Sequence, residues 1–405
     1  MFRSEFFGGR KQRCLFARPA ARMRGMRVSI AILFPLIFCG LAQAQWWHVQ
    51  TSGIDSNLRG VSAANTPDAK GMPVPVVWAS GSNGVILKSL DEGKTWERLH
   101  VNGGDALDFR GIVAFNSRTA YVMSSGEGEK SRIYKTSDGG ETWKLQHTDK
   151  RKEFFLDTIA CVSETHCFTL GDPIDGKFLL LTTTDGEHWN LLSTGNMPAA
   201  LSGEGAFAAS NTCLFVSGEE ILFGTGGPAA RVFHSGDSGR TWTATETPIA
   251  HGNASSGIFS ITQGDGKSLL IVGGDYQDPK RTTAVAAYSS DDGMTWQLSE
   301  QQPGGYRSSV ACIEDALCMA IGTTGEDATI SVAIATTGEH ARVRNVSPAI
   351  WSPTGALNLN AMAILDFQFG WAVGPQGTIA RLINQQKRIR RQPNDAPRTA
   401  SPIAH

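Results

Sequence analysis

Charged side chains are scarce in this chain: only 19% of the 405 residues are Asp, Glu, Lys or Arg. Disordered polyelectrolytes need a much higher share, so that class is excluded. Long apolar stretches are missing too, apart from one near the start, which excludes a protein with several membrane-spanning helices. Neither a glycine triplet nor a heptad persists, which excludes collagen and coiled coils. What remains is rich in glycine (45) and tryptophan (10) and long enough for a sizeable core.

Patterns that carry cofactor or enzyme chemistry are also absent. The nine histidines are scattered, with no pair at the spacing typical of a metal site. The chain has no Cys-x2-Cys pair, no dinucleotide-binding glycine fingerprint after a strand and no serine on a nucleophile elbow. We therefore expect neither a metal nor a cofactor.

The formal net charge of −1 conceals three differently charged segments. Residues 1–44 carry eight Lys or Arg and one acid, and residues 385–405 carry five Lys or Arg and one acid. The part between them has 24 basic and 36 acidic side chains, and such an acidic body argues against a nucleic-acid partner. The C-terminal segment lacks apolar periodicity, so we predict a disordered basic tail; contact with an acidic surface or anionic lipid is the alternative.

The N-terminal segment has the three parts of a secretory signal. Arg22, Arg24 and Arg27 precede a short apolar run over 28–41, and the segment ends in Ala-Gln-Ala at Ala44. Small residues at these last positions are typical of a cleavage site, and the run is short for a bilayer span. We predict cleavage after Ala44 and a periplasmic or secreted protein that is not embedded in a membrane, with an uncleaved anchor as the alternative.

Four of the seven cysteines form two pairs with the same spacing of six residues. Cys161 and Cys167 frame one polar turn between apolar runs, and Cys312 and Cys318 frame another, which is the pattern of a β-hairpin. Cysteines that face each other across a hairpin meet disulfide geometry, and export places them in an oxidising compartment. We predict two disulfides, with two pairs of buried thiols as the alternative, and a free core thiol at Cys213.

A phrase of the form Ser/Thr-x-Asp-x-Gly-x-Thr-Trp recurs along the chain. Its tryptophans lie 46 to 54 residues apart, a period typical of a propeller blade and too long for a short solenoid repeat. Each copy therefore indicates one supersecondary unit. Full copies cover 89–96, 136–143, 235–242 and 289–296; a shortened copy covers 183–189, and a worn copy without Asp or Trp covers 336–340.

Each part of the phrase has a physical role in a turn. Ser, Thr and Asp side chains close turns by hydrogen bonds to the backbone, and glycine supplies a positive φ angle. Thr and Trp then re-enter a strand, and the indole ring packs between neighbouring sheets. We therefore predict that the aspartates hold turns together, and we do not assign them as catalytic acids.

Each unit is predicted to contain four strands, with the phrase between the third and the fourth. The last unit, over 370–382, lacks an outer strand, and an isolated strand over 46–50 can supply it and close the ring. We predict an all-β, seven-bladed β-propeller over residues 45–384, closed by its N-terminal strand, or six blades if one worn copy is a loop. The first strands are expected to begin near Leu58, Phe109, Phe155, Gly205, Gly257, Tyr306 and Leu359.

The segments GSNGVILKSLDEGKTW (81–96) and GWAVGPQGTIARL (370–382) resemble the photosystem II stability/assembly factor family, and the resemblance covers residues 46–384. The phrase itself resembles the Asp-box, or BNR repeat, of sialidase-like propellers, and the architecture is similar to WD40- and YVTN-like repeats. The resemblance implies an exported, seven-bladed propeller that acts as a chaperone-like binder. It also implies an arginine-rich surface that holds a segment of the partner.

Propellers bind ligands at the mouth of the central channel, where the first strands and their preceding loops converge. Alignment of the hairpins places Arg59, Arg110 and Arg307 at one equivalent position, with Asn360 and Leu156 there in two other blades. Arginine binds a carboxylate through two hydrogen bonds, so we predict a protein or peptide partner, an acidic one in particular, or an anionic carbohydrate. Further candidate ligand residues are Asp157, Glu204, Asp275 and Tyr276.

Two alternatives to a binding scaffold remain open. The arginines can brace neighbouring blades through salt bridges to Asp108, Asp157 or Glu204. The protein can also be a sialidase-like glycoside hydrolase, which needs a Tyr nucleophile, a partnering Glu and a separate acid. Tyr306, Tyr276, Glu204 and Asp157 are available by residue type. The Arg-Ile-Pro phrase typical of the first sialidase blade is absent, with Leu-Arg-Gly around Arg59 in its place, so we expect a non-catalytic scaffold.

Overall fold

Twenty-nine strands and one turn of 3-10 helix, η1 (Gly128–Lys130), make up the regular structure of the described residues. The computed structural model describes residues 47–264, 266–313, 317–323, 329–334, 350–366 and 368–383. The predicted secretory signal, the worn repeat copy at 336–340 and the predicted basic tail lie outside this part of the chain. Within it, no helix has the length and apolarity needed to cross a membrane.

The strands of the described residues form seven antiparallel sheets. The first three sheets are β2 (Leu58–Pro67), β3 (Pro73–Gly81), β4 (Ile86–Ser89) and β5 (Glu97–Leu99); β6 (Asp108–Ala114), β7 (Ala120–Ser125), β8 (Arg132–Thr136) and β9 (Lys144–Thr148); and β10 (Leu156–Cys161), β11 (Cys167–Ile174), β12 (Lys177–Thr183) and β13 (Asn190–Leu191). The next two are β14 (Leu214–Ser217), β15 (Glu220–Gly224), β17 (Arg231–Ser235) and β18 (Thr243–Glu246); and β16 (Gly226–Gly227), β19 (Asn253–Gln263), β20 (Leu269–Asp275), β21 (Ala286–Ser289) and β22 (Gln297–Leu298). The last two are β23 (Ser309–Ile313), β24 (Leu317–Ile321), β25 (Thr329–Ile334) and β26 (Ile350–Ala356); and β27 (Ala361–Ile364), β28 (Gly370–Val373), β29 (Ile379–Leu382) and β1 (Trp47–Gln50).

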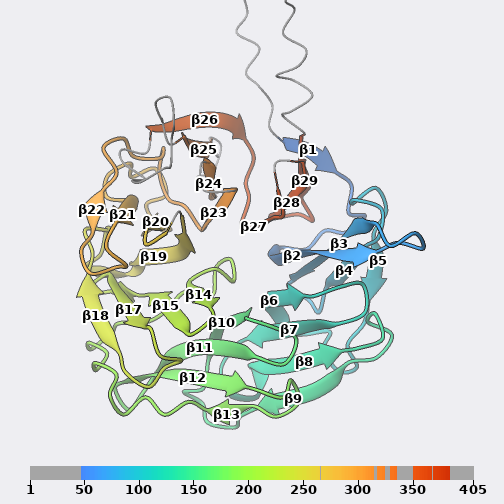
Figure 1. Cartoon of the computed structure of the whole chain (residues 1–405), viewed down its shortest axis with the longest axis horizontal. Coiled ribbons are helices and arrows are strands. Elements are labelled where there is room, and N and C mark those ends of the chain that lie inside the picture. Colours follow the sequence, from blue (N-terminus) through green and yellow to red (C-terminus); the bar gives the residue numbers. More distant parts are fainter. Residues whose placement is uncertain are drawn as a thin grey trace, which may run out of the picture. The chain divides into compact units, whose positions relative to one another are not determined.

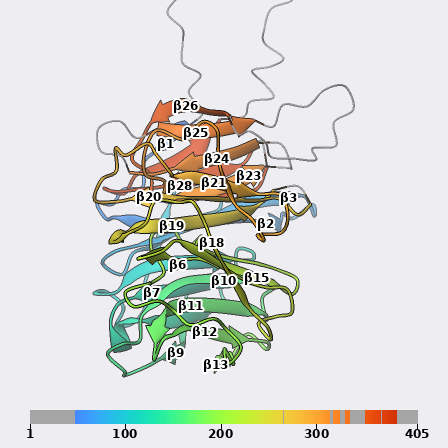
Figure 2. The same ribbon diagram turned by 90° about the vertical axis from the view of Figure 1, so that its left-hand side faces the viewer.

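The first strands of these sheets contact one another in a closed circle. β2 packs against β6, β6 against β10, β10 against β14, β14 against β19, β19 against β23, β23 against β27, and β27 against β2. Figure 1 looks down on this circle, and Figure 2 shows the sheets from the side. The predicted all-β propeller fold is therefore confirmed.

The N-terminal strand completes the sheet of the C-terminal strands. β1 pairs antiparallel with β29, with Trp47 opposite Leu382 and Gln50 opposite Ile379. The Gln50 side-chain amide also donates to the Glu92 carbonyl oxygen of the next sheet at 3.0 Å. The predicted closing strand is confirmed, and the outer edge of β29 is paired instead of open.

Hydrophobic clusters lie between consecutive sheets. One cluster joins Trp78 of β3 to Ile112 and Val122 of the next sheet, and Trp143 from the turn after β8 packs against it. The Trp78 and Trp143 rings meet edge to face, with centroids 6.2 Å apart. Each repeat therefore buries its apolar surface only when the next repeat is in place.

The repeated turns have the geometry expected from the phrase. In the third full copy, the Thr241 N–H and hydroxyl donate to the two carboxylate oxygens of Asp237, at 2.8 and 2.6 Å. The Gly239 N–H donates to the Ser235 hydroxyl at 2.8 Å, and the Trp242 indole donates to the Gly239 carbonyl oxygen at 2.9 Å. The hydrogen bonds from Thr241 lower the pKa of Asp237 to about 2. The same Asp–Thr bonds recur in the other three full copies, which confirms that these aspartates hold turns.

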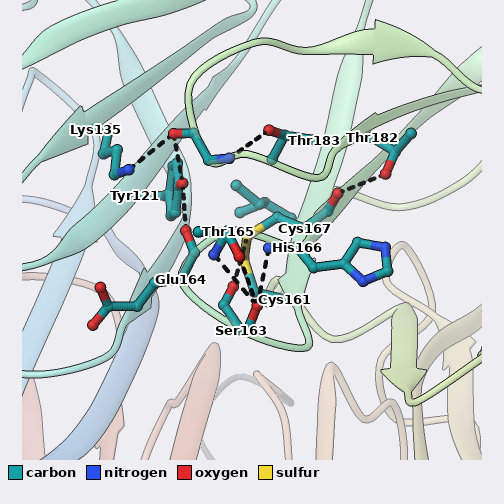
Figure 3. The surroundings of a disulfide bond; sticks show 12 residues. Tyr121, Lys135, Cys161, Ser163, Glu164, Thr165, His166, Cys167, Thr182 and Thr183 are labelled. Atoms are coloured by element: carbon teal, nitrogen blue, oxygen red, sulfur yellow. Dashed lines mark hydrogen bonds between the residues drawn. A yellow bond between two sulfur atoms is a disulfide. The ribbon is translucent and has the colours of Figure 1, made fainter.

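Both predicted disulfides are present. Cys161 and Cys167 lie opposite each other on β10 and β11 and are bonded, and Cys312 and Cys318 are bonded in the same way on β23 and β24. Figure 3 shows the first bridge at the end of its hairpin, beside the turn that contains Ser163. Cys213 is a buried free thiol as predicted, and burial raises its pKa.

We expect the double substitution Cys161→Ala and Cys167→Ala to lower the free energy of unfolding by about 2 kcal/mol. The bridge closes a short loop, because its cysteines are separated by 6 residues, so the unfolded chain gains little freedom when the bridge is removed. Urea denaturation of the two proteins under non-reducing conditions measures the difference. An unchanged midpoint would show that the hairpin is held by its backbone pairing alone.

The predicted start of the fourth unit is wrong. Gly205 makes one isolated bridge to Gly226, and the first strand of that sheet, β14, begins at Leu214. The intervening residues 205–213, which we call the strap, are not a strand of this sheet. They are rich in Gly, Ala, Ser and Asn, which have little preference for strands, and their hydrogen bonds go to several other sheets instead.

Candidate functional site at the channel mouth

Four of the first strands carry a bulge at the same place. The register shifts at Arg59 of β2, Arg110 of β6, Asp157 of β10 and Phe259 of β19. A bulge leaves one residue out of the ladder and re-aims its side chain. All four side chains line one cavity of about 560 Å³ near the centre of the circle of first strands. Its wall also includes Phe155, Asp172, Phe207, Tyr276, Tyr306, Ser308 and Asn360.

The alignment that placed Arg307 with Arg59 and Arg110 is wrong by one residue. The Arg307 N–H donates to a carbonyl oxygen of the preceding sheet at 2.9 Å, and the Leu58 N–H makes the equivalent bond at 3.1 Å. Arg307 therefore matches Leu58, and Ser308 is the residue that matches Arg59. The paired cysteines give the same match, because Ser308 lies four residues before Cys312 as Asp157 lies four residues before Cys161. Ser308 and Asp157, and not Arg307 and Leu156, therefore correspond to Arg59.

The Arg307 side chain consequently lies in the interior and does not line the cavity. Its Nη1 donates to the carbonyl oxygens of Gly305 and Tyr306 at 3.1 and 2.8 Å. Burial lowers the pKa of Arg307 to about 10. A shift by one residue turns a side chain to the opposite face of a strand, which explains why a residue expected in the channel is part of the core.

Arg59 and Arg110 converge on a single carbonyl group of the strap. Arg59 Nη2 lies 3.4 Å and Arg110 Nη1 lies 3.1 Å from the Ala208 carbonyl oxygen. Arg110 Nε also donates to Asp108 on its own strand at 2.7 Å, so the expected salt bridge to Asp108 is present. Burial lowers the pKa of Arg59, and the nearby Arg110 charge lowers it further. Arg59 Nε has no hydrogen-bond partner among the described residues.

The strap crosses between sheets and forms part of the cavity wall. The Ser210 hydroxyl donates to the Ser308 carbonyl oxygen at 2.6 Å, on a sheet two further along. Asn211, with a φ of 63°, accepts the Ile159 N–H at 2.8 Å. Figure 1 shows the connection ahead of β14 reaching toward the centre of the circle. The strap thus carries the Ala208 carbonyl to both arginines, a feature that sequence reasoning missed.

The carboxyl groups of Asp157 and Asp172 line the same cavity. Asp157 is 1% exposed, and its Oδ2 has no partner among the described residues. Burial raises the pKa of Asp157 well above its ordinary value, the nearby Asp172 raises it further, and Arg110 opposes the shift. Burial also raises the pKa of Asp172, although its Oδ1 accepts the Ala206 N–H at 3.1 Å. A protonated carboxyl group is a hydrogen-bond donor, so this side of the cavity can donate as the arginines do.

Aromatic rings form the apolar part of the wall. Phe259 stacks on Phe207 of the strap, with centroids 3.8 Å apart. The Phe259 ring also meets the rings of Tyr306 and Tyr276 edge to face, with centroids 4.8 Å and 6.1 Å apart. Tyr276 is 49% exposed, as expected for a residue at the rim, whereas burial raises the pKa of Tyr306. The cavity therefore combines cationic, acidic and aromatic surfaces.

Glu204 and Asp275 do not line this cavity, although the sequence grouped them with it. The Glu204 carboxylate is bound by Arg231 through Nε at 2.9 Å and through Nη2, and by the Thr225 hydroxyl at 2.6 Å. Asp275, the last residue of β20, accepts the Ser255 hydroxyl at 2.6 Å and the Asn253 side-chain amide at 2.9 Å, both from β19, and the Gln277 N–H at 2.9 Å. Both carboxylates are used in holding the structure together. Arg231 was not identified from the sequence, because it lies 27 residues from its partner.

The residues proposed for a hydrolase are only partly brought together. Tyr306 and Asp157 line the cavity, and Glu204 does not. A tyrosine nucleophile needs a neighbouring base, whereas Tyr306 has a raised pKa and Glu204 is bound by Arg231. The geometry therefore favours binding over glycoside hydrolysis.

The circle of sheets and the cavity at its centre define the protein as a β-propeller. No family model and no curated protein matches the chain. Solved structures similar in fold include YCF48 bound to a D1 peptide, at 13% identity and a TM-score of 0.57, over 83% of this chain and 96% of the other. YCF48 from Cyanidioschyzon merolae matches at 13% identity and a TM-score of 0.55, over 84% of this chain and 99% of the other. A streptogramin B lyase structure matches at 12% identity and a TM-score of 0.55, over 84% of this chain and 97% of the other.

These identities show the fold alone. The peptide-bound YCF48 and the lyase resemble this chain to nearly the same degree, with TM-scores of 0.57 and 0.55, so the architecture does not distinguish binding from catalysis. The function has to be argued from the residues at the mouth.

Proposed function

We propose that this protein is an exported, seven-bladed propeller that binds a peptide segment of a partner protein at the channel mouth and catalyses no reaction. The observation that carries the proposal is the convergence of Arg59 and Arg110 on one cavity that also contains Asp157. The similarity in fold to YCF48 bound to a D1 peptide supports it. The two disulfides are consistent with an oxidising compartment.

The chemistry of the cavity indicates the kind of segment. Arg59 Nε and Asp157 Oδ2 are both buried without partners among the described residues, so each leaves hydrogen-bonding capacity for a ligand. A carboxylate can accept from both guanidinium groups and from a protonated Asp157. The rings of Phe259 and Tyr276 offer contact to an apolar side chain. We infer a segment that combines acidic and apolar residues.

We expect the double substitution Arg59→Ala and Arg110→Ala to weaken binding of such a segment strongly. A hydrogen bond to a charged group contributes about 1.5–3 kcal/mol, which corresponds to roughly 10- to 100-fold in affinity for each arginine. The probe is a fluorescently labelled peptide of alternating Glu and Leu, and its affinity is measured by fluorescence anisotropy. Its Lys-for-Glu counterpart should not bind.

The matched control is Arg98→Ala, because Arg98 is an exposed arginine on the outer strand β5. It removes the same charge away from the mouth and should leave the affinity unchanged. Circular dichroism of each variant checks that the propeller is intact. Equal affinities for the native protein and the double variant would rule out the mouth as the binding site.

A further inference from the structure

We call the interface between two consecutive sheets a seam. In three seams of the described residues, a cationic side chain at the same position bridges the two sheets. Lys88 and Lys135 stand just before the Ser or Thr of the repeated turn, and Arg381 has the same register, since it lies opposite Trp371 as Lys88 lies opposite Trp78. Each reaches from the third strand of its sheet to the turn of the next sheet. Lys88 Nζ donates to the Gly139 carbonyl oxygen at 2.7 Å, and Arg381 Nη2 donates to Glu92 Oε2 at 2.6 Å. Lys135 Nζ donates to a turn carbonyl oxygen in the same way at 2.9 Å, as Figure 3 shows. Fixed positive charges thus hold these sheets together.

The seam between the β14–β18 sheet and the β19–β22 sheet differs at this position. Here the residue before the turn is His234, and Asp292 of the next turn occupies the place of Glu92. Lys and Arg carry a permanent charge at neutral pH, whereas the imidazole nitrogen of histidine is a common metal ligand. This seam therefore has an imidazole where those three seams have a permanent cation, whereas Thr182 and Tyr288 occupy the position in two further sheets.

The same seam also contains a carboxylate, that of Glu220, which the sheets of Lys88 and Lys135 lack at this position. Glu220 begins β15, at the register position that Val76 and Thr119 occupy in other sheets. Its Oε2 lies 2.5 Å from His234 Nε2. Glu220, His234 and Asp292 each offer one ligand atom, and all three atoms lie within 4.8 Å of one another. Lys267 Nζ lies 3.4 Å from Asp292 Oδ2, and the Lys267 side chain is 75% exposed.

We propose that a divalent first-row metal ion, with Zn²⁺ as the first candidate, binds at Glu220, His234 and Asp292 and joins the two sheets. Imidazole nitrogen and carboxylate oxygen are ligands that Zn²⁺ takes at about 2.0–2.2 Å. Ligand atoms at such bond lengths lie roughly 3–3.5 Å apart around the ion. The Glu220 and His234 atoms, which are 2.5 Å apart, therefore separate by about 1 Å, and Asp292 moves closer by up to about 1.5 Å, through side-chain rotations. With three protein ligands, water completes the coordination. The ion supplies the positive charge that Lys88, Lys135 and Arg381 supply in their seams.

The site was not visible in the sequence because its ligands come from two sheets. Glu220 and His234 lie on adjacent strands of one sheet, and Asp292 lies in the turn of the next sheet. No pair of them has the short spacing of a sequence motif. The inference is independent of the peptide site, which is formed by other strands.

The experiment uses the full chain without an affinity tag, titrated with ZnCl2 and separately with CaCl2 by isothermal calorimetry. We expect one Zn²⁺ per chain and a rise in the melting temperature of about 3 °C or more at saturating metal. Ca²⁺ should bind more weakly, because an imidazole ligand suits Zn²⁺ and not Ca²⁺. Glu220→Gln and Asp292→Asn should each weaken Zn²⁺ binding by at least about tenfold.

The decisive variant is His234→Lys, which places a fixed cation at this position, as in the seams of Lys88, Lys135 and Arg381. It should lose Zn²⁺ binding while its metal-free melting temperature equals or exceeds that of the native protein. The control is His188→Gln, because His188 is an exposed histidine paired with one carboxylate, Asp185, at 2.8 Å. It should bind Zn²⁺ as the native protein does.

Three outcomes would overturn the proposal: no Zn²⁺ response of the native protein, equal affinities for Zn²⁺ and Ca²⁺, or loss of binding in His188→Gln. If His234→Lys fails to fold, Co²⁺ absorption spectra of the native protein and Glu220→Gln decide. A d–d spectrum in the native protein that is reduced in the variant supports the site, and identical spectra overturn it.

Discussion

Replacing Glu204 by Gln is expected to lower the free energy of unfolding by about 3–5 kcal/mol. The Glu204 side chain is fully buried, and that of Arg231 is 11% exposed. Removing the carboxylate charge leaves the Arg231 guanidinium buried without its counter-ion, and this desolvated charge is the origin of the cost. Urea denaturation monitored by tryptophan fluorescence gives the difference.

The matched control is Glu219→Gln, in the exposed pair of Glu219 with Arg240 at 3.9 Å. Exposed pairs of this kind contribute up to about 1 kcal/mol, so this variant should be close to the native protein. A second comparison is the double variant Glu204→Leu and Arg231→Met, which removes both charges and should recover much of the lost stability. Similar costs for Glu204→Gln and Glu219→Gln would contradict the interpretation of Glu204 as a structural ion-pair partner.

We expect Trp47→Ala to be similarly damaging, with a loss of about 3–5 kcal/mol in the free energy of unfolding. Trp47 is 1% exposed and packs in a cluster with Leu359, Met362 and Leu382. The substitution leaves a large cavity, and it weakens the one strand that completes the last sheet. Thermal and urea unfolding measure the loss.

Val49 provides the control on the same strand, since its side chain is 48% exposed. Val49→Ala should change the stability by less than about 1 kcal/mol. Hydrogen exchange adds a local test, because backbone amides of β29 should exchange faster in Trp47→Ala than in Val49→Ala. Equal effects of the two variants would mean that β1 adds little to the closure of the last sheet.

The features that followed from the sequence are those set by local chemistry. The turn around Asp237 depends on residues within seven positions, and the Cys161–Cys167 bridge on residues six apart. Side-chain hydrogen bonds and hairpin geometry act over such distances, so a repeat read along the chain predicts them. The closing strand was predicted by counting strands, because the last unit lacked an outer strand and the strand over 46–50 belonged to no unit.

The features that did not follow depend on register or on contacts between sheets. Arg307 was misplaced because an alignment error of a single residue changes which face of a strand a side chain occupies. The strap was interpreted as a strand because its role comes from partners such as Arg110 and Ser308, which lie about 100 residues away. Glu204 was assigned to the mouth by its type, whereas its partner Arg231 is set by the packing of its own sheet.

The pairing of β1 with β29 has a consequence for how the chain acquires its structure. Trp47 finds its partner Leu382 only after another 335 residues have been made. Until then the earliest strand has no neighbour, and the entropy of closing so large a loop opposes its docking. A chain with such distant contacts is expected to fold slowly and to assemble its ring last at this junction. Molecules interrupted before residue 379 would carry all four full copies of the repeated turn and both disulfides, and yet their last sheet would remain incomplete.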